Sequence, residues 1–157
     1  MRPVIHVPRC ERYLMRVAHR DGDPVMSTAN ETLVRTAYAA YEQGDVATLL
    51  DTVDPNLEWT YLDPSEANPE PQICHGRGEL EIALQRQLRR GLSVRLEELI
   101  ANGDRIMVTV RIPGVEAHRV RPGNERNYDV LTVRDGHIVA IRACRDRAEA
   151  LAIAGII

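Results

Sequence analysis

The stretch from Tyr128 to Asp146 limits most strongly how this chain can fold. Two apolar, β-branched runs flank the dipeptide Asp135-Gly136, which favours a two-residue hairpin turn because both residues tolerate positive φ. The turn therefore predicts an antiparallel ribbon with a fixed register. The pairs expected to face each other on one side of the ribbon are Val133 with Ile138, Leu131 with Ala140, and Asp129 with Arg142.

Both faces of this ribbon carry apolar side chains, so we expect both to be covered. Helices are expected on one face. The other face would present Val130, Val139 and Ile141, which is a large apolar surface for a monomer to leave exposed and favours a homodimer through the outer sheet face. Asp129 stands at the open end of the first face. A guanidinium opposite it, from Arg142, would favour the ionised carboxylate.

The length, net charge and composition of the chain limit the number of domains, the partners and the chemistry that we expect. A chain of 157 residues fits one domain with its own core. The formal net charge of -3 gives no electrostatic reason to expect nucleic acid or an anionic membrane as a partner. All 20 basic residues other than histidine are arginine, so a lysine Schiff base is excluded.

The three cysteines, Cys10, Cys74 and Cys144, lack the spacing of a metal site. Unpaired cysteines are typical of a reducing compartment, and no apolar run is long enough to span a membrane. We therefore expect a cytoplasmic protein that holds no metal. Residues 1–26 carry no sustained hydrophobic period and are expected to be a poorly ordered extension. A single domain would then cover residues 27–157.

The first regular element is predicted to be a helix over residues 28–43, because Leu33, Val34 and Ala37 recur at helical spacing with two tyrosines. Those tyrosines, Tyr38 and Tyr41, are expected to be partly buried and to turn their hydroxyls toward a cavity. After this helix, Asp45 is expected to cap a short second one. A polar loop over residues 113–126 and a last helix capped by Asp146 complete the expected ends of the chain.

A strand is predicted over residues 57–63, and its period-two pattern places Trp59, Tyr61 and Asp63 on one face. Asp63 precedes a proline, so it either shapes the turn or shares a pocket with the two aromatic rings. His75 precedes a helix predicted over residues 79–90. It is either a structural residue at the start of that helix or a donor at the rim of a pocket.

Two further strands, over residues 94–101 and 104–112, are expected to join at Asn102-Gly103. Helices followed by a run of antiparallel strands indicate an α+β fold. We expect a cystatin-like cone, in which a curved antiparallel sheet wraps around the N-terminal helices. Its internal pocket would be lined by Trp59, Tyr61, Tyr38 and the ribbon over residues 129–142.

Several short patterns resemble one superfamily. They are the strand LEWTYLDP, the helix start HGRGEL, the hairpin NYDVLTVRDGHIVAIRA and the tail RDRAEALAIAG. The chain from about residue 28 to 155 is similar to the nuclear-transport-factor-2-like superfamily, above all to its SnoaL-like and ketosteroid-isomerase-like members. This resemblance implies a general base at Asp63, before Pro64, and a second aspartate at Asp129. The resemblance also implies a tyrosine on the first helix, at the position that Ala37 occupies in this sequence. Tyr38 is the next residue.

Two functions are open at this point. The first is a cofactor-independent isomerase or cyclase that acts on a ketone or polyketide-like substrate, with Asp63 as the base and Tyr38 or His75 as the donor. The second is a module of the same fold that binds a small hydrophobic molecule or a second copy without catalysis. The expected catalytic residues are Asp63, Asp129, Tyr38 and His75, and the expected substrate-binding residues are Trp59, Tyr61, Tyr41, Leu131 and Arg142.

Overall fold

A computed structural model describes residues 23–62, 70–91, 93–112 and 125–156. The helices are α2 (Asp23–Glu42), α3 (Val46–Asp51), α4 (Gly76–Arg89) and α5 (Arg147–Ile153). The strands are β1 (Val53–Tyr61), β2 (Gln72–His75), β3 (Arg95–Asn102), β4 (Arg105–Arg111), β5 (Arg126–Arg134) and β6 (His137–Cys144). Asp63 lies outside the described residues.

The six strands form one curved sheet with the order β2-β1-β6-β5-β4-β3. Neighbouring strands are antiparallel except for β1 and β6, which are parallel. The expected α+β architecture with a curved sheet is therefore confirmed, with one parallel pair inside it. That pair joins the two halves of the chain, because β1 comes from its beginning and β6 from its end.

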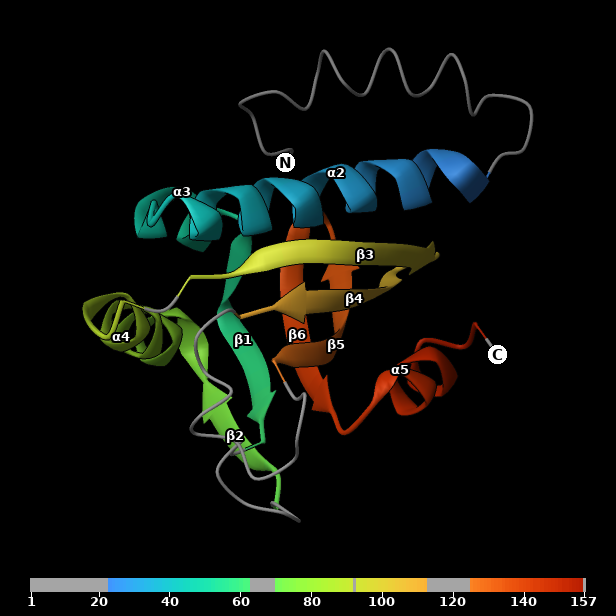
Figure 1. The fold of residues 1–157 in the computed structure, drawn as a ribbon. Coiled ribbons are helices and arrows are strands. Elements are labelled where there is room, and N and C mark those ends of the chain that lie inside the picture. The colour runs from blue at the N-terminus through green and yellow to red at the C-terminus, as the bar shows by residue number, and fades with distance from the viewer. Residues whose placement is uncertain (1–22, 63–69, 92, 113–124, 157) are drawn as a thin grey trace.

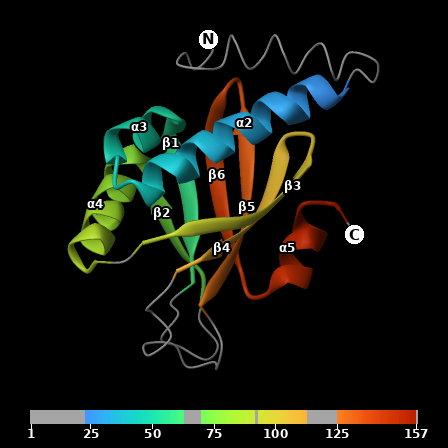
Figure 2. The same cartoon turned by 45° about the horizontal axis from the view of Figure 1, so that its top comes forward.

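Helices cover the two faces of the sheet unequally (Figures 1 and 2). We call the face that packs against α2, α3 and α4 the inner face, and the face that packs against α5 the outer face. The main core lies on the inner face, where Leu57, Ile106 and Leu131 are at most 1% exposed. A smaller core lies under α5 around Met107 and Val130, which are 0% and 3% exposed.

The side chains of β4 alternate between the two faces of the sheet, as the period-two pattern of its sequence indicates. Ile106, Val108 and Val110 point inward to the main core, while Met107 belongs to the core under α5. Period-two alternation therefore supplies both cores from one strand, which is possible because each face has its own cover.

The predicted caps form where the sequence indicates. Asp45 Oδ1 accepts the backbone N–H of Thr48 at 3.1 Å and starts α3. Asp146 Oδ1 accepts the backbone N–H of Glu149 at 2.8 Å and starts α5. Each bond satisfies a donor that the first turn of a helix leaves without an intrahelical partner.

Several boundaries differ from those that the sequence predicts, among them the start of β1 at Val53 rather than residue 57 and the start of α4 at Gly76 rather than residue 79. Helix α2 begins at Asp23, so its first turn lies within the range 1–26 that we expected to be an extension. Strand β2 lies between the strand and the helix that the sequence predicts, in a segment where the sequence pattern indicates no regular element, because a four-residue edge strand close to prolines carries little signal. The β3–β4 turn is Gly103-Asp104 rather than Asn102-Gly103, since Asn102 pairs with Arg105.

Candidate functional site

The β5–β6 hairpin orients the candidate site. Asp135 and Gly136 have φ values of 51° and 77°, as expected for the predicted turn, and Arg134 pairs with His137. Asp129 lies opposite Val108 of β4 and shares the inner face with Leu131. Its carboxylate is thus half-buried on the inner face of the sheet.

Beyond Val133, the register of the hairpin differs from the predicted one. A bulge shifts the pairing, so that Thr132 lies opposite Ala140 rather than Val139. As a result Asp129 pairs with Ala143, and Arg142 pairs with Val130 on the outer face. The predicted pairing of Asp129 with Arg142 is therefore wrong, because one extra residue moves every later side chain of β6 to the opposite face.

Two phenols from α2 lie near the Asp129 carboxylate. Burial raises the pKa of Tyr38 well above its ordinary value, and the negative charge of Asp129 raises it further. Burial and Asp129 also raise the pKa of Tyr41. Both causes favour the neutral phenol. The site therefore combines one carboxylate with two tyrosines that keep their protons far above neutral pH.

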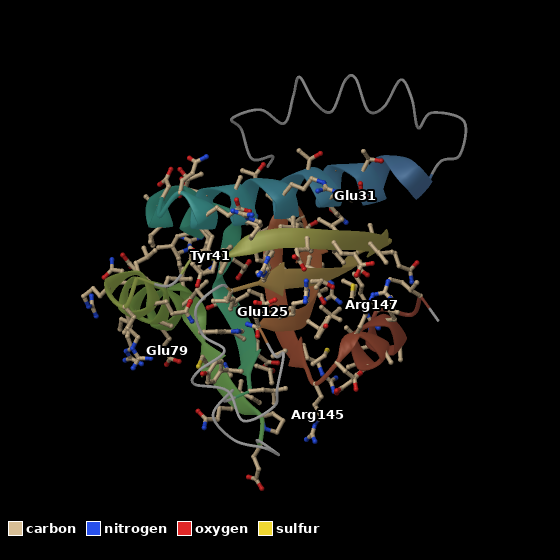
Figure 3. All side chains as sticks on the ribbon, viewed as in Figure 1. Glu31, Tyr41, Glu79, Glu125, Arg145 and Arg147 are labelled. Carbon is tan, nitrogen blue, oxygen red and sulfur yellow. The ribbon has the colours of Figure 1, made fainter. Side chains whose placement is uncertain are left out.

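Tyr41 has a fixed partner that the sequence did not reveal. Its hydroxyl donates a hydrogen bond to Gln87 Oε1 of α4; Figure 3 shows Tyr41 on the side of α2 that faces α4 and the sheet. Gln87 is half-buried and lies close to the buried stripe formed by Leu80 and Leu84. A glutamine beside a leucine stripe was the available signal, because a half-buried amide needs partners.

Strand β1 contributes the aromatic wall of the site. Trp59 and Tyr61 share one face, and their rings meet edge to face with centroids 5.8 Å apart. Trp59 packs against the main core and lies opposite Ile141 of β6. These contacts place the two predicted aromatic residues on the same face of the sheet as Asp129.

Two of the other predicted site residues, His75 and Arg142, lie on the outer face, and Leu131 is part of the core on the inner face. His75 pairs with Glu58 across β1 and β2, which places it on the outer face, and its side chain is exposed. Its backbone N–H donates to Glu79 Oε1 at 2.9 Å, so it is a residue at the start of α4. Leu131 is 1% exposed and belongs to the main core. Arg142 is exposed on the outer face, away from Asp129.

The described residues contain no group of three or more histidine, cysteine or acidic side chains that could hold a metal ion. None of the helices found in those residues is both long enough and apolar enough to cross a membrane. The chemistry that the described site offers is that of a carboxylate, two phenols and an aromatic wall.

Comparisons with known proteins place this geometry in a family. A model of the SnoaL-like domain matches residues 34–141, and no curated protein matches the chain significantly. Among solved structures, the protein Bal32a from a soil-derived mobile gene cassette is 21% identical, with a TM-score of 0.60, over 79% of this chain and 95% of that one.

Two further solved structures share the fold. A proposed polyketide cyclase from Sinorhizobium meliloti is 16% identical, with a TM-score of 0.56, over 72% of this chain and 94% of that one. A proposed ketosteroid isomerase from Kribbella flavida is 15% identical, with a TM-score of 0.54, over 74% of this chain and 77% of that one. Because the family model matches most of the chain, the protein belongs to the family of SnoaL-like domains.

Proposed function

We propose that this protein is a cofactor-independent isomerase or cyclase that moves a proton on a ketone or polyketide-like substrate. The observation that supports this most directly is the cluster of Asp129, Tyr38 and Tyr41 on the inner face, where burial and the carboxylate keep both phenols protonated. The polyketide cyclase and ketosteroid isomerase of the same fold support the same reaction class.

Tyr38 is the donor in this proposal. When a base removes the proton next to a ketone, negative charge develops on the carbonyl oxygen, and a donor fixed beside that oxygen lowers the barrier. Tyr38 is suited to this because it is neutral and carries a hydroxyl proton that it can share with the oxygen. The hydroxyl of Tyr41 already donates a hydrogen bond to Gln87, so Tyr41 is the less suitable donor. His75, on the outer face, has no part in this step.

Asp63 is the base in this proposal, as the resemblance to steroid isomerases implies. It lies two positions after the end of β1 at Tyr61. Its carboxylate takes the proton from the carbon next to the carbonyl, and the C–H electron pair moves to the carbonyl oxygen as an enolate. If the enolate is conjugated with a C=C bond, return of the proton from Asp63 to another carbon gives the isomer. Attack of the enolate on a second carbonyl closes a ring, and the alkoxide formed from that carbonyl takes the proton back from Asp63.

The substrate would be largely apolar. Trp59 and Tyr61 give a wall of two rings, and the main core continues behind them. Apolar walls strengthen the electrostatic effect of the few polar groups because they exclude water. A small, mostly apolar ketone fits this distribution of groups.

The test is exchange of the α-hydrogens of cyclic ketones with deuterated water, followed by mass spectrometry. We expect Tyr38→Phe to slow the exchange by roughly 10²- to 10³-fold, the cost of losing one donor to an oxyanion, and Asp63→Asn to abolish the enzymatic component. Tyr128→Phe is the matched control, since Tyr128 pairs with Cys144 on the outer face, and it should exchange as fast as the wild type.

Equal exchange in the wild type and Asp63→Asn would contradict catalysis. If the cyclic ketone then still bound, with an affinity that Trp59→Ala reduces, the second function would be supported. The protein would be a module that holds a hydrophobic molecule without converting it.

A further inference from the structure

Helix α5 covers only part of the outer face, and a hollow of about 480 Å³ lies beside it. Strands β1, β4, β5 and β6 form the floor of the hollow, and α5 with the segment before it forms one side. This is the face of the sheet opposite to Asp129, so the hollow is separate from the candidate catalytic site. Its volume lies in the range of about 300–1,000 Å³ that is usual for small-molecule pockets.

Arginines dominate the charge of the hollow. Arg105 of β4, Arg142 of β6 and Arg145 before α5 line it, against the carboxylates of Glu58 and Glu149. One of those carboxylates is already engaged, because Glu149 Oε2 accepts the backbone N–H of Arg145 at 3.0 Å. Figure 3 shows Arg145 at the point where β6 passes into α5.

Two of the arginines differ in how they are held. Arg105 donates from Nη1 to the carbonyl of Ile153, at the end of α5, at 2.8 Å, which fixes its guanidinium and leaves other N–H groups to donate. Arg142 is exposed, and within the described ranges no carboxylate lies at ion-pair distance from it. The guanidinium of Arg142 is therefore accessible to an anion from solvent.

Hydroxyls accompany these two arginines. Thr60 lies opposite Arg142 across β1 and β6, and Thr132 lies opposite Arg105 across β4 and β5. Side chains directly opposite each other in a sheet have Cβ atoms about 5 Å apart. The apolar side chains that line the same face are those of Leu62, Pro71, Val130, Ala140 and Ile153.

We propose that this hollow binds a small organic oxyanion, a carboxylate or phosphate on a short apolar body. Guanidinium groups bind both oxyanions through paired N–H donors, and the threonine hydroxyls supply further hydrogen bonds. The apolar lining contacts the body of the ligand. This site goes beyond the proposed function, because it needs none of the residues on the inner face.

The test uses the full chain labelled with ¹⁵N and three probes of equal length: hexyl phosphate, hexanoate and the uncharged hexanol. We expect both anions, but not hexanol, to give saturable shifts of the backbone amides of Thr60 and Thr132. Arg142→Gln should weaken anion binding at least about tenfold, the loss of one charge-assisted hydrogen bond. Arg89→Gln is the matched control, because Arg89 is exposed in the last turn of α4.

Whichever of hexyl phosphate and hexanoate binds more tightly shows whether the site prefers a phosphate or a carboxylate. Equal binding of hexanol, or equal binding to Arg142→Gln and wild type, would overturn the proposal. So would shifts confined to residues around Tyr38, because the probes would then occupy the inner site. Sedimentation of the same sample shows whether a second copy covers the outer face, and a dimer in which neither anion shifts Thr60 or Thr132 would also refute the proposal.

Discussion

Asp129 and the two tyrosines of α2 interact through charge across the space between helix and sheet. The carboxylate contributes to the raised pKa of Tyr38 and of Tyr41, after the larger effect of burial. The helical spacing of i and i+3 places both phenols on one side of α2. The carboxylate of Asp129 on β5 therefore contributes to the raised pKa of two tyrosines on helix α2.

Asp129→Asn should lower the pKa of both tyrosines, because it removes a negative charge that disfavours the tyrosinate. The measurement is the ultraviolet absorbance of tyrosinate as the pH is raised, with Tyr38→Phe and Tyr41→Phe to assign the transitions. Asp104→Asn, in the β3–β4 turn, is the matched control. Unchanged titration in Asp129→Asn would mean that the carboxylate does not act on these phenols.

The same shifts predict how stability depends on pH. In the unfolded chain a tyrosine loses its proton near pH 10.0, whereas in the folded state Tyr38 and Tyr41 keep theirs to higher pH. Above pH 10.0 the unfolded state therefore binds fewer protons than the folded state. The free energy of unfolding falls as the pH rises through this range. Urea denaturation at several alkaline pH values should show a shallower fall for Tyr41→Phe than for the wild type.

Among the elements, α5 shows most clearly how a short helix is held. Asp146 caps its first turn, and Arg147 donates to both carboxylate oxygens of Glu98 at 2.9 and 2.6 Å. At the other end, Asn102 Nδ2 donates to the carbonyl of Ala154 at 2.8 Å. Seven residues are too few for an isolated helix in water, so these contacts and the core beneath it stabilise α5.

Loss of the Asp146 cap should open α5 and expose Cys144. Burial, with the charge of Glu149, raises the pKa of Cys144 to about 12, so its thiol should react slowly at neutral pH. Asp146→Ala should cost about 1 kcal/mol and speed alkylation of Cys144, read by peptide mass spectrometry. The control variant Asp45→Ala removes the cap of α3 instead, so Cys144 should still be alkylated slowly in it. If both variants speed the alkylation of Cys144 equally, the cause is global unfolding rather than the opening of α5.

The β5–β6 turn has its own test. Gly136 has a φ of 77°, which costs any residue with a Cβ about 1–2 kcal/mol. Gly136→Ala should lower the free energy of unfolding by that amount in urea denaturation. Gly78→Ala is the control, because Gly78 lies in α4 without a positive φ and with open space around it; it should not destabilise the protein. Equal effects would contradict the turn.

At the scale of the whole molecule, the inner core joins three helices to most of the sheet, so the described fold should unfold cooperatively. Leu57→Ala should cost about 2–5 kcal/mol, because Leu57 is 0% exposed in that core. Ile73→Ala, on the adjacent strand β2, should cost less than about 0.5 kcal/mol because Ile73 is 56% exposed. Urea denaturation measures both, and similar losses would contradict the assigned core.

The homodimer remains a prediction, but the reason we gave for it is wrong. Val130 is 3% exposed because α5 covers it, and Ile141 packs against the inner core. The exposed large apolar residues of the described chain are Ile73 and Ile82, on β2 and α4. Within the described residues, these two side chains and the polar part of the outer face are the surfaces that a dimer could use.

The sequence by itself determined most of the elements, both helix caps, the alternation of β4 and the β5–β6 turn. These depend on contacts between residues close in the chain, which local spacing encodes. It also determined that Asp129 faces inward, since the turn fixes the register of β5 and that strand has no bulge opposite β4.

Only the tertiary structure decided the rest of the site. The bulge in β6 reversed the place of Arg142, and a one-residue irregularity leaves no clear signal in a run of alternating apolar residues. Gln87 meets Tyr41 only because the fold brings this part of α4 close to the C-terminal end of α2. The cover over Val130 comes from a helix too short to form alone. Which groups meet across elements depends on packing that no local pattern contains.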